Sequence, residues 1–314
     1  MTDAPLRLGT RRSPMAIAQS TSVARLLEAR IGRAVRIVGI TTAGDISQAH
    51  LAQIGGTGVF VSALREHLLS GEVDFAVHSL KDLPTTPARG IALAAVPRRD
   101  DPRDALVAPN GCKLSDLPTA ARIGTGSPRR AAQLLVMRPD VRPVPIRGNA
   151  GTRLAKVGSG EVDAVVLASC GLARIGKLHL VSQAFEVDEM VPAPGQGALA
   201  VECLADRPDL IELLRQVDDK ASRAATTAER GVLAALEAGC SAPVGAYAAG
   251  TDELRLDAIV VAADGGAALR GSVTGPAEQA AQLGAELAAD LLARGANRYT
   301  DVSAGHLSYG GDAK

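Results

Sequence analysis

The sequence predicts an α/β protein with two similar doubly wound domains that form a cleft, followed by a small C-terminal α+β domain. Strand-like and helix-like segments alternate through the first two hundred residues, and two phrases recur later in the same order. Beyond residue 220 the pattern changes to a helix, a hairpin and a second helix. Because helices separate the short strands, we expect parallel sheets with right-handed crossovers.

Local signals define the elements of the first domain. Ser13 and Pro14 supply an N-cap and a first-turn proline, and Phe60, Leu64 and Leu68 recur every four residues in a stretch that Gly71 ends. The expected elements are a strand at 6–10, a helix from 14 to about 30, a strand at 35–40, a helix at 59–71 and a strand at 73–79.

The repeat predicts the second domain. "LGTRRSPMAIAQ" (8–19) returns as "IGTGSPRRAAQ" (123–133), and "GEVDFAVHSLKDL" (71–83) returns as "GEVDAVVLASCGL" (160–172). We expect a strand near 198–203 to return to the first domain after two connecting segments. The predicted boundaries are 1–97 with 198–215, 103–191, and 220–307; the last part holds a helix at 221–239, a hairpin at 254–275 turning at 264–266, and a helix at 276–295.

Composition excludes several functions. The 314 residues are 46% hydrophobic and 22% charged, and 34 basic residues balance 34 acidic ones. A neutral chain with no Trp, three Phe and three Tyr argues against nucleic acid or an anionic membrane as a partner. The N-terminal residues do not resemble a signal peptide, and the four widely spaced cysteines suggest neither a zinc site nor disulfides. We therefore expect a cytoplasmic protein with no metal.

Basic residues gather at the two Ser-Pro turns. Arg11 and Arg12 flank the first, and Arg129 and Arg130 lie in the first helical turn of the second. Exposed N–H groups and the dipole make helix N-termini suitable for anions, although plain caps with solvated arginines remain the alternative. Further arginines, at 147, 153 and 174, favour a ligand with many carboxylates or phosphates.

An acidic residue distinguishes the first copy of the repeat. Asp82 follows Lys81 at the end of a predicted strand, whereas the second copy has Gly171 and Cys170 at these places. An acid present in one copy alone is a candidate for acid–base chemistry. His78 is as consistent with a buried structural role as with a functional one.

Cys240 follows a helix C-terminus, where the dipole disfavours a thiolate, so the residues alone favour an inert buried cysteine. The glycine-rich stretches 52–60 and 193–198 lack nucleotide-binding patterns and are interpreted as a mobile lid and a hinge.

Together, "HSLKDLP", "IRGNAGTRL", "PAPGQGALAVEC", "EAGCSAPVGAY" and both Ser-Pro phrases resemble the porphobilinogen deaminase (hydroxymethylbilane synthase) family, in order from about residue 6 to 300. The resemblance implies two domains similar to type II periplasmic binding proteins. It also implies a transferase of tetrapyrrole and heme (porphyrin) biosynthesis. Such an enzyme deaminates four porphobilinogens, joins them head to tail on a dipyrromethane cofactor, and releases hydroxymethylbilane and ammonia.

The resemblance also implies roles for single residues. Cys240 would carry the dipyrromethane through a thioether, and Asp82 would be the catalytic carboxylate that protonates the leaving amine and stabilises the positive charge. The implied substrate- and cofactor-binding residues are Arg11, Ser13, Ser79, Lys81, Thr125, Ser127, Arg129, Arg130, Arg147, Arg153, Arg174 and Gln196. A monomer is the expected state.

Some positions depart from the family pattern. Gln53 and Thr57 stand where many members have lid lysines, and Ala43 replaces a basic residue, which puts the lid's share in carboxylate binding in doubt. Gly126 and Pro128 replace commoner residues of the second turn. A non-enzymatic protein that binds an oxyanion or small carboxylate is the alternative function; it leaves the third domain and Asp82 unexplained.

Overall fold

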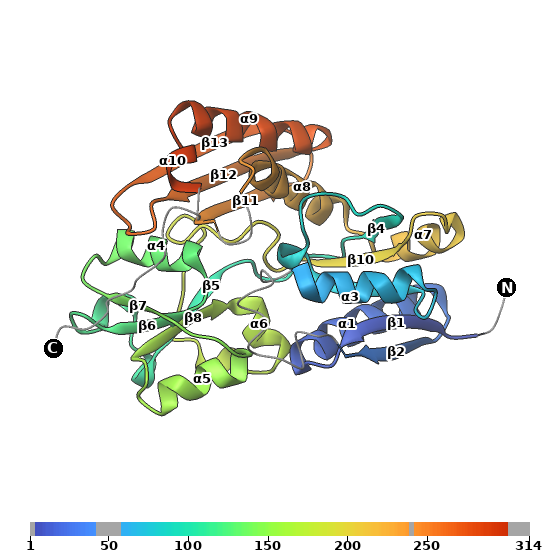
Figure 1. Cartoon of the computed structure of the whole chain (residues 1–314), viewed down its shortest axis with the longest axis horizontal. Helices are drawn as coiled ribbons and strands as arrows, with labels where there is room; N and C mark the ends of the chain where they lie inside the picture. Colours follow the sequence, from blue (N-terminus) through green and yellow to red (C-terminus); the bar gives the residue numbers. More distant parts are fainter. Residues whose placement is uncertain (1–3, 42–57, 239–241, 301–314) are drawn as a thin grey trace. The chain divides into compact units, whose positions relative to one another are not determined.

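The computed structural model describes residues 4–41, 58–238 and 242–300, and it divides into two compact units (Figure 1). The first unit contains residues up to 100 and 195–226, and the second contains 101–194 and the residues from 227 onward. Cys240 and the lid positions Gln53 and Thr57 lie outside the described residues.

The first unit is built on a five-stranded sheet with the order β2-β1-β3-β10-β4. Its strands are β1 (Leu6–Arg11), β2 (Val35–Ile40), β3 (Phe75–Ser79), β4 (Ile91–Ala95) and β10 (Leu199–Leu204), and its helices are α1 (Pro14–Ile31), α3 (Gly58–Leu69) and α7 (Pro208–Leu214). The strand after the second connecting segment thus lies in this sheet, between β3 and β4.

The caps of α1 form as their sequence predicts. The Ser13 hydroxyl accepts a hydrogen bond from the backbone N–H of Ala16 (3.2 Å), and Pro14 occupies the first turn. At the other end, Gly32 adopts a φ of 66°, and its N–H donates to the Glu28 carbonyl. The helix therefore begins and ends where residues can satisfy its free backbone groups.

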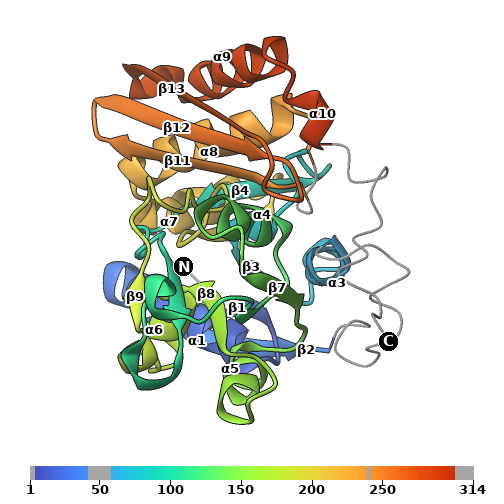
Figure 2. The same ribbon diagram turned by 90° about the vertical axis from the view of Figure 1, so that its left-hand side faces the viewer.

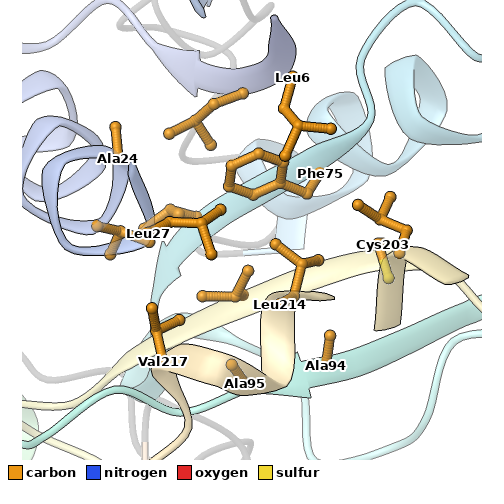
Figure 3. Packing of buried hydrophobic residues seen from close by; sticks show 14 of the residues in the cluster. Leu6, Ala24, Leu27, Phe75, Ala94, Ala95, Cys203, Leu214 and Val217 are labelled. Atoms are coloured by element: carbon orange, nitrogen blue, oxygen red, sulfur yellow. The ribbon is translucent and has the colours of Figure 1, made fainter. Parts of the chain in front are cut away.

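An apolar cluster between the sheet and its helices forms the core of this unit (Figure 3). Phe75 of β3 and Leu27 of α1 are fully buried. Leu214 of α7, which comes from the segment 195–226, packs in the same cluster. Burying one side chain of this size contributes roughly 1.5–3 kcal/mol. Residues before 100 and after 195 therefore stabilise one core together.

The second unit repeats this arrangement in the sheet β7-β6-β8-β5-β9. Its strands are β5 (Asp104–Val107), β6 (Arg122–Thr125), β7 (Arg142–Pro145), β8 (Ala164–Ala168) and β9 (Gln183–Ala184), and its helices are α4 (Pro128–Met137), α5 (Ala150–Gly158) and α6 (Ser169–Arg174). The sequence echo thus corresponds to two sheets of one topology, which confirms the predicted fold class of two similar α/β domains.

Both units contain an aspartate–arginine ion pair at the same position of the repeat. Asp74 of the first "GEVD" pairs with Arg7 (2.8 Å), and Asp163 of the second pairs with Arg122 (3.0 Å). In each pair the carboxylate also accepts the arginine's own backbone N–H, at 2.7 Å. Each aspartate therefore joins the start of the third repeat strand to the start of the first.

The prediction of parallel sheets is confirmed for β1, β2 and β3 and for β6, β7 and β8, but it is wrong for β10 and β5. β10 runs antiparallel to β3 and β4, and β5 runs antiparallel to β8 and β9. Both strands come directly after connecting segments and not after crossover helices, so no crossover imposes a parallel direction on them. Each sheet is therefore mixed, with one reversed strand in the fourth position.

A third sheet, β11-β12-β13, completes the second unit. Its strands are β11 (Val244–Gly250), β12 (Glu253–Val261) and β13 (Ala268–Pro276), and α9 (Ala280–Ala293) and α10 (Asn297–Thr300) belong to the same unit. Helix α8 (Lys220–Ala235) begins in the first unit and continues into the second at residue 227. The predicted hairpin is confirmed as β12 and β13, whereas β11 was not predicted. Helix α9 packs on this sheet, as Figure 2 shows, where the glycines at 271 and 275 make room for its leucines.

Candidate functional site

In the first unit, the "HSLKDLP" segment turns sharply at the carboxyl end of β3. A short 3-10 turn spans Leu80–Asp82, and the backbone N–H of Leu80 donates to the Ala198 carbonyl (3.0 Å). Asp82 is half-buried at the end of this turn. The site predicted for acid–base chemistry thus lies at the strand ends of an α/β sheet, the usual place for functional residues.

The predicted hinge packs directly on that turn. Gly195 has a φ of +78°, and a Cβ there would lie 3.2 Å from Leu80 Cγ and 3.3 Å from the Lys81 nitrogen. Gln196 is fully buried; its side-chain oxygen accepts a hydrogen bond from Lys81 Nζ (3.1 Å), and its carbonyl accepts one from Arg99 Nε (2.7 Å). The structure therefore brings Lys81 of this turn and Gln196 together, and it adds Arg99, which sequence reasoning missed.

Three further predicted residues lie at the same edge of the first sheet. Arg11 ends β1, Ser13 caps α1, and the Ser79 hydroxyl accepts a hydrogen bond from Gln19 Nε2 (2.8 Å). β1 and β3 are parallel neighbours, so their carboxyl ends meet at one edge. Gln19 was not predicted, although it is the glutamine of the repeated phrase.

Glu202, Arg65 and His78 form a buried ionic cluster that joins β3 to β10 and α3. Glu202 of β10 makes a bidentate pair with Arg65 of α3 (2.7 and 3.0 Å), and His78 Nε2 lies 3.3 Å from the same carboxylate. Burial by itself would raise the pKa of Glu202, but hydrogen bonds and charge from His78 and Arg65 outweigh it and lower the pKa to about 2. This cluster favours the structural role for His78.

We expect the Glu202 cluster to make stability depend on acidity. The native pKa of about 2 lies below the ordinary value of 4.5, so its stabilisation is complete above pH 4.5 and is lost as the pH falls toward 2. The shift corresponds to on the order of 3 kcal/mol. Urea unfolding of the wild type and of Glu202→Gln should differ most at neutral pH and converge as the pH approaches 2. A difference that does not change with pH would contradict this account.

In the second unit, predicted residues surround the N-terminus of α4. The Ser127 hydroxyl caps the helix, and its backbone N–H donates to Thr125 Oγ1 (3.2 Å). Arg153 lies over this turn, since a Cβ at Gly126 would be 3.7 Å from Arg153 Nη2. Burial lowers the pKa of Arg153, and the charge of Arg130 lowers it further. The structure therefore gathers guanidinium groups around this helix end.

Arg129 and Arg130 are themselves buried and paired. Arg129 Nη1 and Arg130 Nη2 each lie 2.7 Å from an oxygen of Asp104, a fully buried aspartate at the start of β5. Arg129 also donates to the Val191 carbonyl (2.7 Å) and Arg130 to the Val166 carbonyl (3.2 Å). Sequence reasoning missed Asp104, because nothing local links it to a helix that begins more than twenty residues later.

The remaining predicted residues are more dispersed. Arg147 is exposed after β7, Arg174 is half-buried at the end of α6, and Cys240 lies outside the described residues. Among the residues described, no group of His, Cys, Asp and Glu is arranged to hold a metal. In the same residues we find no helix with the length and apolar content needed to cross a membrane.

The donor groups of each unit, taken by themselves, fit a ligand rich in carboxylates. Ammonium, guanidinium and capping hydroxyl groups stand at the strand ends of both sheets, and guanidinium binds carboxylate through paired hydrogen bonds. A dipyrromethane whose rings carry acetate and propionate groups matches this chemistry. The residues present therefore fit the cofactor that the sequence resemblance implies.

Comparison with known proteins agrees with these features. Residues 6–212 match the family model "Porphobilinogen deaminase, dipyromethane cofactor binding domain", and residues 224–293 match "Porphobilinogen deaminase, C-terminal domain". A porphobilinogen deaminase of Thermobifida fusca is 58% identical, covering 97% of this chain and 99% of that protein. Porphobilinogen deaminase 1 of Streptomyces coelicolor is 56% identical, covering 94% and 97%.

A periplasmic substrate-binding protein of an ABC transporter from Coxiella burnetii is similar to 68% of this chain and 91% of its own, with a TM-score of 0.43 and 16% identity. The sequence matches extend over nearly the whole chain and both family models. The protein belongs to the porphobilinogen deaminase family.

Proposed function

We propose that this protein is a transferase of tetrapyrrole (heme and porphyrin) biosynthesis, a hydroxymethylbilane synthase. It deaminates four porphobilinogens, joins them head to tail on a covalent dipyrromethane, and releases hydroxymethylbilane and ammonia. The observation that carries this proposal is the match to the family over both of its models. The position of Asp82 in the turn whose Lys81 donates a hydrogen bond to the buried Gln196 supports it.

Asp82 is the proposed general acid. Its carboxyl group protonates the amine that leaves each porphobilinogen, and its carboxylate then stabilises the positive charge on the ring that remains. The short turn Leu80–Asp82, on which Gly195 packs closely, places the backbone of Asp82 at the strand end. Such a position limits the freedom that the carboxylate loses when the substrate binds.

Cys240 is the proposed attachment point of the dipyrromethane, which supplies the free pyrrole α-position on which the product chain grows. The residues proposed to bind acetate and propionate groups in the first unit are Arg11, Ser13, Ser79, Lys81 and Gln196. Those proposed in the second unit are Thr125, Ser127, Arg129, Arg130, Arg147, Arg153 and Arg174. Each charge-assisted hydrogen bond of this kind contributes roughly 1.5–3 kcal/mol.

We also propose the organisation of the chain and its setting. The two α/β domains are 1–97 with 198–215 and 103–191, and the cofactor-attachment domain is 220–307. The protein acts in the cytoplasm as a monomer, with porphobilinogen as its small-molecule partner and neither nucleic acid nor membrane. The balanced charge of the sequence supports this setting.

Intact mass spectrometry of the purified wild-type protein tests the function. We expect a surplus equal to two deaminated porphobilinogen units, and further increments of one unit when the protein is incubated with porphobilinogen. Ammonia should be released in proportion to the porphobilinogen consumed. Protein of bare polypeptide mass that consumes no porphobilinogen would instead favour the binding-protein alternative.

A further inference from the structure

In the second unit, Asp104, Arg129 and Arg130 form a buried ionic cluster. The corresponding positions of the first unit hold apolar residues. Asp104 pairs with Ala168 at the end of β8, and Leu199 pairs with Ser79 at the end of β3. Ala168 and Ser79 hold the same position in the repeated "GEVD" phrase, eight residues after its glycine. Asp104 is therefore the counterpart of Leu199, which belongs to the apolar core of the first unit.

The two arginines show the same relation. They are the second and third residues after Ser127, and the corresponding residues after Ser13 are Met15 and Ala16. One copy of this topology thus folds with Leu, Met and Ala at the three positions. The other has Asp104 between Arg129 and Arg130, with at most 5% of each residue's surface exposed.

Burying these charges costs hydration free energy that the attraction between paired charges often does not recover. Each buried ion loses hydration worth several kcal/mol, and replacing a buried ionic triad with apolar residues of similar size is often neutral or stabilising. The first unit shows that the topology accepts such residues. The charged version therefore needs a reason other than folding.

The geometry of Asp104 points to that reason. Its carboxylate contacts both guanidinium groups at 2.7 Å, with a further hydrogen bond from Arg130 Nε at 2.8 Å. Its backbone is fixed by β8 on one side and by a hydrogen bond from the N–H of Phe185 on the other. The carboxylate is thus a rigid anchor for both side chains in the first turn of α4.

We infer that Asp104 is a positioning residue, which holds Arg129 and Arg130 in place so that their charge acts on substrate carboxylates at the N-terminus of α4. This inference rests on the proposed function, because it assigns the ligand of that helix end. The charge of Arg130 contributes to lowering the pKa of the nearby Arg153. The cluster therefore sets the electrostatic potential of the turn formed by Thr125, Gly126 and Ser127.

Asp104→Asn tests the positioning role, because it keeps the shape of the side chain and removes its charge. We expect the KM for porphobilinogen to rise about tenfold, the order of one lost charge-assisted hydrogen bond. The matched control is Asp163→Asn, which breaks the partly exposed pair with Arg122 in the same sheet and should leave KM unchanged. A KM equal to that of the wild type in Asp104→Asn would overturn the inference.

A triple variant separates binding from folding. Asp104→Leu, Arg129→Met and Arg130→Ala together copy the residues of the first unit, and we expect a Tm within a few degrees of the wild type. We also expect this variant to form no porphobilinogen adducts by intact mass. An unfolded triple variant would show that the cluster serves folding, and it would refute the inference.

The Asp104→Asn kinetics and the triple variant also distinguish this inference from the function on which it rests. If the wild-type protein itself consumes no porphobilinogen, the proposed function fails, and with it the assigned ligand. If the wild type is active and Asp104→Asn matches it, only the positioning role fails. The Tm comparison uses no substrate and is informative in either case.

Discussion

Replacing Cys240 with serine is expected to give a protein with the mass of the bare polypeptide and no turnover of porphobilinogen. A thiol is the stronger nucleophile, and a serine hydroxyl without an adjacent base reacts poorly even with strong electrophiles. Because attachment happens once, the reaction does not require a thiolate of lowered pKa. Intact mass and an assay of ammonia release measure the two effects directly.

Cys112→Ser is the matched control for that variant. Cys112 is a half-buried free cysteine in the second unit, so its replacement changes sulfur to oxygen without opening a core. We expect this control to carry the surplus mass and to remain active. A surplus that persists in Cys240→Ser, or that is lost in Cys112→Ser, would show that another residue carries the cofactor.

Asp82→Asn is expected to lower kcat by about two to four orders of magnitude, the usual contribution of a positioned general acid. Asparagine has the size of aspartate, so the turn Leu80–Asp82 and its contact with Gly195 should be retained. Because the lost interaction acts mainly in the transition state, KM should change little. Steady-state kinetics with porphobilinogen provide the measurement.

Asp206→Asn is the control for Asp82, since Asp206 is an exposed aspartate of the same unit. It should retain wild-type kcat. If Asp82→Asn also retained wild-type kcat, the proton would have to come from another group, and the uniqueness of Asp82 between the two copies would lose its chemical meaning.

Local signals in the sequence predicted much of the fold. The caps at Ser13 and Ser127 and the β12–β13 hairpin depend on residues within a few positions of one another, and the structure confirms them. Strand β11 was missed because "VGAYAAG" lacks the β-branched alternation by which a strand is recognised. The direction of β5 and β10 was wrong because strand and helix alternation carries no information about a strand that follows a connecting segment.

The candidate site was predicted less completely, because its pairings span long distances in the chain. Asp104 and Arg130 are 26 residues apart, and Arg65 and Glu202 are 137 apart. One signal was present: Glu202 stands in the otherwise apolar strand "ALAVEC", and a carboxylate in a buried strand requires a partner. Which cation provides that partner depends on tertiary structure.

The position of β10 has a consequence for synthesis on the ribosome. β10 lies between β3 and β4, and β4 has β10 as its neighbour in the sheet. A nascent chain that has emerged only to residue 190 therefore holds every strand of the second sheet but leaves β4 and one edge of β3 without a partner. During translation, the second sheet can therefore fold first. The first sheet exposes backbone hydrogen-bonding groups until β10 has been synthesised.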